Sequence, residues 1–178
     1  NGGQNIRAVN ALMALTGNIG KPGAGVYYLN PSSDSFPLRL SKHNSSVQNR
    51  QISINNFAQS ILTLKDPPVK FIWISGRNPL SQDQGLGAWL ELLNRMEMIV
   101  TVDLFMTKTA EQSDLVLPAA SHFEEYDLNT SYWHYWLALN EKALPAYYEA
   151  KSDLEIVRLL ASTLNKLSPG FSNFPTDL

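Results

Sequence analysis

The chain has 178 residues, of which 44% are hydrophobic and 17% are charged, and its formal net charge is −2. This length is enough for one domain with a real core, and the charge gives no reason to expect nucleic acid or an anionic membrane as a partner. The sequence contains no cysteine, which excludes disulfides, cysteine-bound iron–sulfur clusters and thiolate metal ligands within this chain. No apolar run approaches the roughly 18–20 residues that span a bilayer, so we expect no direct membrane insertion. The first residue is Asn1 rather than methionine, so we expect a piece of a longer protein, whose compartment stays open.

The N-terminal stretch has the pattern of a helix followed by a glycine-rich loop. Apolar residues at helical spacing, interleaved with alanines, predict a helix over residues 6–15. Residues 16–25 hold four glycines and a proline, which demand turns with positive φ. Such a loop can approach a phosphate, but without a preceding strand it more often marks tight geometry alone. Residues 26–29 favour a short strand. In the long polar loop of residues 30–51, the lone His43 is interpreted as a solvated histidine rather than a metal ligand.

The middle of the chain has the pattern of a strand–helix–strand unit. Ser53 is a candidate N-cap for a helix over residues 54–64. A strand is predicted over residues 69–75, a helix from about Gln82 to Arg95, and a buried strand over Met98–Asp103. The two strands and the helix span about 35 residues, the size of a βαβ unit. We therefore expect an α/β fold with a mainly parallel sheet, these two strands adjacent in it, and helices on both faces.

A polar loop follows each of these strands at its carboxyl end, where open α/β sheets bind ligands. Gly76 permits close approach of the backbone, Arg77 can pair a phosphate, and Asn78 carries both a donor and an acceptor. Asp103 ends the second strand, and its carboxylate can accept two bonds from a purine edge or a ribose. Simpler interpretations are a helix cap for Asp103, a surface arginine for Arg77 and a plain turn for Asn78-Pro79. Because the two loops should face one crevice, we favour ligand binding.

The segment after Pro118 is acidic and aromatic. His122, Glu124 and Glu125 match no helical metal motif, so we expect no metal site in this chain. The aromatic run over residues 132–136 alternates as in a strand, and packing of one face is favoured over a stacking platform. That face comprises Trp133, Tyr135, Leu137 and Leu139.

A closing helix is predicted over residues 153–164. Ser152 can cap it, and Glu155 stands three residues later, as in a capping box. The apolar side chains that we expect to pack are Leu154, Val157, Leu160, Ala161 and Leu164. The tail over residues 168–178 is rich in Pro, Ser and Asn, and we expect it to fray.

Several short motifs follow one another in a specific order between about Ala8 and Asn165. They are residues 15–25 (LTGNIGKPGAG), Asn78-Pro79, residues 103–110 (DLFMTKTA), residues 114–118 (DLVLP) with Glu124 downstream, and residues 151–156 (KSDLEI). Each motif alone is loose, whereas the ordered set is specific. With this set the chain resembles the molybdopterin oxidoreductase family, which includes formate dehydrogenases, periplasmic nitrate reductases and dimethyl sulfoxide reductases.

The resemblance implies a fragment of a larger enzyme, with residues 1–167 forming a three-layer, Rossmann-like dinucleotide-binding domain. Family members hold a molybdenum or tungsten ion between two molybdopterin guanine dinucleotides, usually beside a 4Fe-4S cluster. The cluster cysteines and the Cys, selenocysteine or Ser ligand of the metal would lie in other parts of the parent, as would the cap domain. The implied function is to bind the guanosine end of one dinucleotide for two-electron redox of a small substrate. We expect the isolated chain to be inactive, and the other parent domains and electron-transfer subunits to be its partners.

The resemblance also implies roles for individual residues. Asp103 corresponds to the carboxylate that grips the guanine and Thr107 to a neighbouring contact, while Gly76 and Asn78 lie at the nucleotide end. The complete set of candidate cofactor-binding residues is Gly76, Arg77, Asn78, Pro79, Asp103, Thr107 and Thr109. Two departures leave the substrate open. Residues 28–33 replace the Arg-Gly-Gln-Asn type segment of some relatives, and residues 128–133 replace a Gly-Thr-Phe-x-Asn stretch.

A non-catalytic α/β domain, either an interaction module or a degenerate subunit with no cofactor, is the second hypothesis. Arg77 and Asp103 discriminate between the two. If both converge on an open crevice, ligand binding is favoured, and if Asp103 is buried and merely caps a helix, the interaction module is favoured.

Overall fold

The computed structural model describes residues 2–26, 50–132 and 135–175. The chain divides into two compact units. One contains Asn1–Gln48 and Asn129–Ala138, and the other contains Asn49–Leu128 and Leu139–Leu178. The predicted strand over residues 26–29 and the loop that carries His43 lie almost entirely outside the described residues.

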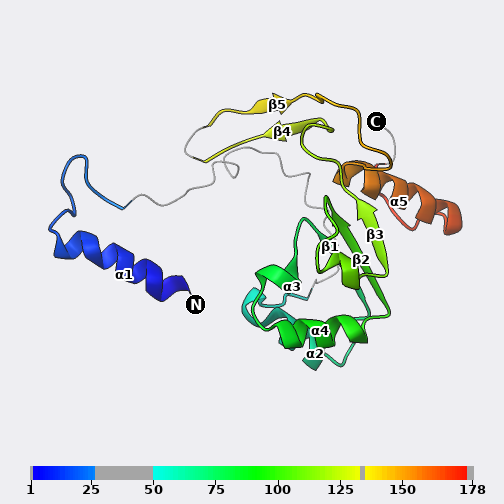
Figure 1. The fold of residues 1–178 in the computed structure, drawn as a ribbon, viewed down its shortest axis with the longest axis horizontal. Coiled ribbons are helices and arrows are strands. Elements are labelled where there is room, and N and C mark those ends of the chain that lie inside the picture. The colour runs from blue at the N-terminus through cyan, green and yellow to red at the C-terminus, as the bar shows by residue number, and fades with distance from the viewer. Residues whose placement is uncertain (1, 27–49, 133–134, 176–178) are drawn as a thin grey trace. The chain divides into compact units, whose positions relative to one another are not determined.

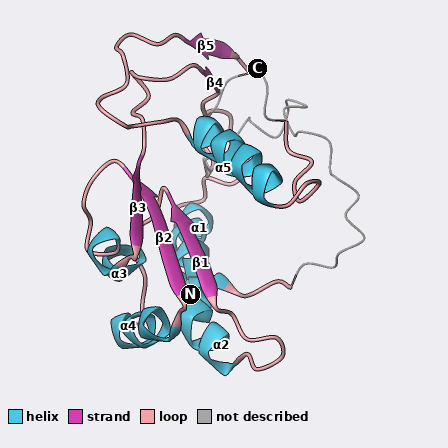
Figure 2. Ribbon diagram, turned by 90° about the vertical axis from the view of Figure 1, so that its right-hand side faces the viewer, coloured by secondary structure: helices cyan, strands magenta, loops and turns pink. Residues whose placement is uncertain are grey.

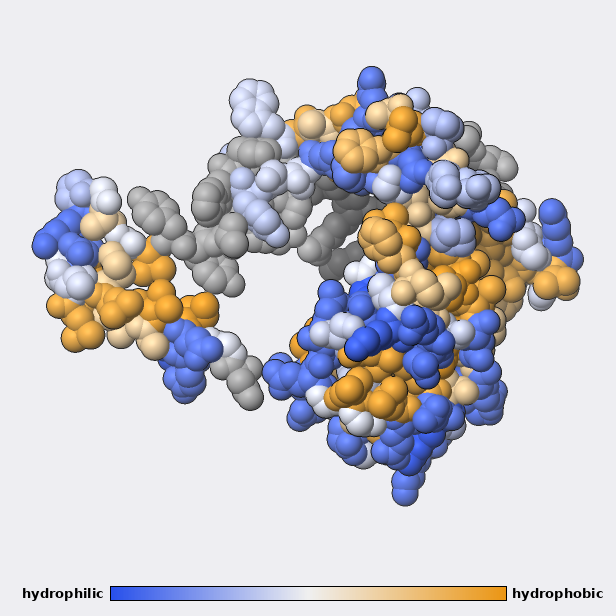
Figure 3. All heavy atoms as spheres, in the orientation of Figure 1, coloured by the Kyte–Doolittle hydropathy of each residue, from blue (hydrophilic) through white to orange (hydrophobic). Residues whose placement is uncertain are grey.

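Helix α1 (Gly2–Leu15) confirms the predicted N-terminal helix. It contains no buried residue in the described part of the chain, and its apolar side chains Ile6, Val9 and Leu12 are about half exposed. The predicted apolar stripe therefore exists but is not covered by described residues, and Figure 3 shows it as hydrophobic surface on α1. The glycines of the following loop, at positions 17, 20, 23 and 25, all have positive φ, as predicted.

Three parallel strands form the main sheet, in the spatial order β1-β2-β3 (Figures 1 and 2). They are β1 (Phe71–Ser75), β2 (Met98–Asp103) and β3 (Leu115–Pro118). The register pairs Ile72 with Ile99 and Val100 with Leu115. The predicted parallel pairing of the first two strands is confirmed. Because β2 has a strand on each side, its residues 99–102 are buried, as in the middle of a parallel sheet.

Two helices pack on this sheet and form most of the core. They are α2 (Phe57–Thr63), preceded by the 3-10 helix η2 (Ile54–Asn56), and α4 (Leu86–Arg95). Ser53 caps η2 as predicted, by accepting from the backbone N–H of Asn55. Leu92 and Trp89 of α4 are buried against α2, while Leu93 is buried with residues of β1 and β2. Helix α4 therefore ties α2 to the sheet.

The predicted helix from about Gln82 to Arg95 ends at Arg95 as expected, but it starts later than predicted. A short helix α3 (Pro79–Gln82) is followed by a break, and α4 starts only at Leu86. The reason is Gly85, whose φ of +77° lies in the left-handed region and cannot continue a right-handed helix. Pro79 opens α3, a position where its missing N–H has no helical partner to lose.

Helix α5 (Asp153–Leu167) has the predicted capping box. The Glu155 N–H donates to Ser152 Oγ at 3.2 Å, and the Ser152 N–H donates to Glu155 Oε2 at 2.9 Å. The bond from the Ser152 backbone is the main reason that the pKa of Glu155 lies below its usual range. The predicted packing face is wrong in part, because Ile156 and Ala161 are the buried residues of α5.

Three other apolar side chains of α5 and the tail after it also differ from the prediction. Leu154, Val157 and Leu160 are partly exposed. The segment before α5 pairs beside β3, through the bridge from Lys151 to Ala119. In the tail that we expected to fray, the Asn165 side chain makes two hydrogen bonds with the Ser172 backbone, each 2.8 Å long.

Strands β4 (Asp127–Asn129) and β5 (Ala138–Asn140) form a separate two-stranded sheet. The predicted packing of the aromatic run is wrong for its described members, since Tyr135, Leu137 and Leu139 are all exposed. Trp133 lies outside the described residues. A two-stranded ribbon has no second layer of its own to bury such side chains. Among the described residues, no helix is long and apolar enough to cross a membrane.

Candidate functional site

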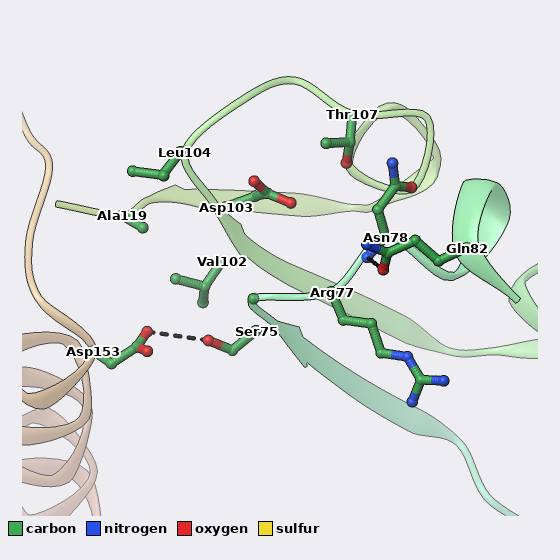
Figure 4. A pocket seen from close by; sticks show the side chains of 11 residues that line it. Ser75, Arg77, Asn78, Gln82, Val102, Asp103, Leu104, Thr107, Ala119 and Asp153 are labelled. Atoms are coloured by element: carbon green, nitrogen blue, oxygen red, sulfur yellow. Dashed lines mark hydrogen bonds between the residues drawn. The ribbon is translucent and has the colours of Figure 1, made fainter. Parts of the chain in front are cut away.

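A cavity of about 380 Å³ lies at the carboxyl edge of the parallel sheet (Figure 4). Its walls come from the loops that follow β1, β2 and β3 and from the first residue of α5. The lining residues are Ser75, Gly76, Arg77, Asn78, Gln82, Val102, Asp103, Leu104, Thr107, Ala119 and Asp153. Parallel strands present their carboxyl ends at one edge of a sheet, which is why residues far apart in the sequence meet here. Five of the seven predicted site residues line this cavity.

The loop after β1 contributes a sharp turn and two polar side chains. Gly76 has a φ of +61°, a conformation that side chains disfavour. The backbone N–H of Asn78 donates to Gln82 Oε1 at 2.9 Å, which holds the loop on α3. Arg77 uses one guanidinium nitrogen for both carboxylate oxygens of Asp83, at 2.8 Å each. Figure 4 shows this guanidinium directed away from Asp103, so Arg77 lines the cavity while its charge is paired with Asp83.

The loop after β2 places a carboxylate and a hydroxyl on the cavity. Asp103 is half-buried, and its Oδ1 accepts from the Phe105 N–H at 3.2 Å. The next short helix, η3 (Ala110–Gln112), has Thr109 as its N-cap residue, so Asp103 is not its cap. Thr107 Oγ1 accepts from the Ala110 N–H at 3.2 Å, which leaves its own proton available. No hydrogen bond reaches Asp103 Oδ2 from the described residues, so this oxygen is an acceptor open to a ligand.

The two remaining predicted residues lie behind the cavity wall and join the two loops. Pro79 and Thr109 are both buried, and Thr109 has no exposed surface. Thr109 Oγ1 donates to Asn78 Oδ1 at 2.7 Å and accepts from the Leu80 N–H at 3.2 Å. This contact confirms the prediction that the two polar loops lie against each other.

Six further residues line the cavity that the sequence does not point to as site residues, namely Ser75, Gln82, Val102, Leu104, Ala119 and Asp153. Ser75 Oγ donates to Asp153 Oδ1 at 3.1 Å, which joins the end of β1 to the start of α5. Gln82 and Ala119 complete the walls. The sequence identifies Asp153 only as the start of a helix, and nothing nearby indicates that this helix begins at the edge of the sheet. Ser75 has a weak signal, because it is the last residue of a strand.

A second cavity of about 430 Å³ adjoins the first and shares Leu104 and Ala119 with it. Glu124 lies in its wall and holds two segments together. Its carboxylate accepts from the N–H and the hydroxyl of Ser121, at 2.8 and 2.7 Å, and from the Tyr147 N–H at 2.7 Å. The bonds from Ser121 are the main reason that the pKa of Glu124 lies below its ordinary value. The described residues contain no group of three or more side chains suited to a metal ion.

Acidification should therefore remove the stabilising effect of Glu124. Because its pKa is lower in the folded than in the unfolded chain, the carboxylate contributes stability above its ordinary value of 4.5 and loses it as the pH falls through the folded pKa. We expect the wild type to be more stable than Glu124→Gln at about pH 7 and to have a smaller advantage at about pH 3, below the ordinary pKa of 4.5. Urea unfolding at both pH values measures the difference in the free energy of unfolding between the two proteins. Glu97→Gln is the control, since Glu97 pairs with Lys70 on the surface and such pairs contribute little. An advantage that is not smaller at the lower pH would contradict the prediction.

Known proteins are similar to this chain in sequence and in fold. The family model described as molybdopterin oxidoreductase matches residues 1–163. The probable oxidoreductase YoaE of Bacillus subtilis is 33% identical over 167 residues, which are 92% of this chain and 25% of that protein. A putative catalytic subunit of dimethyl sulfoxide reductase from Halobacterium salinarum is 31% identical over 157 residues, covering 86% of this chain and 19% of that protein. Acetylene hydratase from Pelobacter acetylenicus has a similar fold, with a TM-score of 0.56 and 24% identity over 66% of this chain and 17% of that chain. The chain thus spans about a quarter of the length of the first of these relatives.

Proposed function

Because this chain belongs to the molybdopterin oxidoreductase family, we propose that its strand-end cavity holds the guanosine end of one molybdopterin guanine dinucleotide. The parent protein in this proposal is a molybdenum or tungsten enzyme that carries out two-electron redox of a small substrate. Residues 1–167 then form a three-layer, Rossmann-like dinucleotide-binding domain of that enzyme. The observation that carries the proposal is the position of Asp103. This residue lines a cavity at the carboxyl edge of a parallel sheet, and its Oδ2 accepts no hydrogen bond from the described residues.

The chemistry of the cavity wall fits a nucleotide. A guanine edge offers two N–H donors, and a half-buried carboxylate such as Asp103 accepts such donors in charge-assisted hydrogen bonds. Thr107 adds a hydroxyl with a proton to donate, and Gly76 lets the backbone approach a ligand closely. Arg77 remains a candidate for phosphate, but it must leave Asp83 to bind one. Pro79 and Thr109 support the site from behind the wall.

In this proposal the chain binds and orients the cofactor, and the redox chemistry is supplied by the molybdenum or tungsten ion of the bound cofactor. The chain has no cysteine, so a cysteine ligand of the metal and the cysteines of a 4Fe-4S cluster would come from other parts of the parent. Those other domains are the proposed partners, and electron-transfer subunits are further candidates.

The isolated chain should carry no molybdenum or tungsten as purified and should have no oxidoreductase turnover. One domain encloses the cofactor on one side only, whereas the full-length parent should contain the metal and release guanine nucleotide on acid hydrolysis. Elemental analysis and nucleotide chromatography of both proteins test this. Stoichiometric metal in the isolated chain would contradict the first expectation, and measurable oxidoreductase turnover would contradict the second. A folded parent with neither metal nor guanine nucleotide would overturn the proposed function and favour a non-catalytic interaction domain.

A further inference from the structure

The sequence makes Thr109 a candidate ligand contact, but its burial and its hydrogen bonds indicate a different role. It has no exposed surface, and it does not line the cavity. Its hydroxyl lies between the two loops, 2.7 Å from Asn78 Oδ1 and 3.2 Å from the Leu80 nitrogen. A buried hydroxyl that touches one cavity residue and the backbone beside it is placed to orient that residue.

The direction of each hydrogen bond at Thr109 follows from counting protons. The Leu80 N–H can only donate, so one lone pair of the Thr109 hydroxyl accepts it. The single hydroxyl proton is buried and needs an acceptor, and among the described residues Asn78 Oδ1 is the acceptor within reach. The carbonyl end of the Asn78 amide is therefore turned toward Thr109, and its NH₂ end is the end left for the cavity.

The Thr109 backbone is itself held from the sheet. Ser113 Oγ donates to the Thr109 carbonyl oxygen at 2.9 Å, so its one proton is used. The buried Thr101 of β2 lies 2.6 Å from Ser113 Oγ and must then be the donor of that bond. The Thr109 backbone is thus bonded directly to Ser113, which in turn is bonded to the middle strand of the sheet, while the Thr109 hydroxyl is held by Asn78 and Leu80.

We infer that Thr109 is a positioning residue that makes Asn78 a hydrogen-bond donor toward the ligand. The inference rests on the proposed function and deepens it. The ligand atom facing Asn78 is then an acceptor oxygen, on a base, a ribose or a phosphate. Asp103 Oδ2 supplies an acceptor on the same cavity, so the wall presents one donor and one acceptor from neighbouring loops.

The orientation of the Asn78 side-chain amide, with its C=O or its NH₂ toward Thr109, can be measured without any ligand by side-chain NMR of the 178-residue chain. The Asn78 NH₂ protons should exchange rapidly with water in the wild type, and the Thr109 hydroxyl proton should be protected. One Asn78 NH₂ proton that is protected in the wild type and loses protection in Thr109→Val would show that the amide is reversed, and would overturn the inference.

GDP is the probe for binding, measured by calorimetry on the same chain. Thr109→Val keeps the shape of the side chain but removes the hydroxyl, and should weaken GDP binding about five- to tenfold, as for the loss of one hydrogen bond. Thr109→Ser should restore binding to near the wild-type value. Thr101→Val is the matched control, because it removes a buried hydroxyl but leaves the bond from Ser113 to the Thr109 carbonyl and the Thr109 hydroxyl itself in place, so it should lower stability without weakening GDP binding. A folded Thr109→Val that binds GDP as the wild type does would contradict the inference.

Asn78→Asp reverses the group presented to the ligand from donor to acceptor. It also adds a negative charge, so Gln82→Glu serves as the charge control, since Gln82 lines the same cavity and its acceptor for the Asn78 N–H is kept. Asn78→Asp should weaken GDP binding at least about tenfold more than Gln82→Glu, and an equal effect would overturn the inference. Guanosine as a second probe shows whether the acceptor oxygen belongs to the nucleoside or the phosphates. If the wild type binds neither probe, nucleotide binding by this chain is refuted, and the proton-exchange measurement still decides the role of Thr109.

Discussion

Replacing Asp103 with alanine in the full-length parent should cause the loss of one dinucleotide cofactor from a protein that still folds. In the proposed complex the carboxylate accepts charge-assisted bonds from two purine N–H groups. Its removal leaves those donors buried and unpaired, at a cost of roughly 2–4 kcal/mol. The local role of Asp103 is small by comparison, because its Oδ1 makes one 3.2 Å bond to the Phe105 N–H. The readout is guanine nucleotide released per enzyme after acid hydrolysis.

Comparison variants separate the charge from the hydrogen bonds. Thr107→Ala removes one neutral bond worth about 1 kcal/mol and should weaken retention less. Asp103→Asn should fall between the two, because one acceptor survives while the amide turns its own donor toward the purine.

Asp114→Asn is the structural control, because it changes a carboxylate at the opposite end of β2. Asp114 Oδ2 accepts from the Ile99 N–H at 2.7 Å, and asparagine keeps an acceptor there. This variant should retain both dinucleotides. Full cofactor content in a folded Asp103→Ala enzyme, checked by circular dichroism, would show that the carboxylate is a local turn element and would refute the assignment.

The second large effect is expected from the core of the unit that carries the cavity. Leu92 has no exposed surface and packs with Ala58, Ile61 and Trp89 where α4 holds α2 on the sheet. Leu92→Ala leaves a cavity there and should lower the free energy of unfolding by about 2–5 kcal/mol. Urea unfolding, followed by circular dichroism, measures the change.

Leu90→Ala is the control for Leu92→Ala, because it makes the same truncation on the same helix at a residue that is 40% exposed. We expect it to cost less than about 1 kcal/mol, since much of the removed surface already faces water. Similar losses in the two variants would mean that α4 does not have the buried face that the structure shows.

Features that depend only on neighbours in the chain can be predicted from the sequence alone. The run from Ile99 to Val102 is buried and β-branched in part, so it is recognisable as an inner strand without its partners. Ser152 and Glu155 form their capping box within one helical turn, and the turns of the glycine-rich loop need positive φ whatever lies nearby. The order of strand, loop and helix also predicts the parallel pairing of β1 and β2, because such a connection places the carboxyl ends of both strands at one edge. Asp103 could be chosen as the leading site residue for that reason alone.

The groups that each of these residues meets depend instead on the tertiary structure. Arg77 is of a residue type that often binds phosphate, but its partner here is Asp83 on the turn that follows α3. Thr109 has the spacing of a ligand contact, but burial turns its hydroxyl to Asn78. Asp153 reaches the cavity because the residues before α5 pair beside β3. Periodicity in a sequence reports that a face is apolar or that a turn is polar, whereas the partner of a side chain depends on contacts between segments that are distant in the chain. Those contacts bring polar residues of two separate loops to the wall of one cavity.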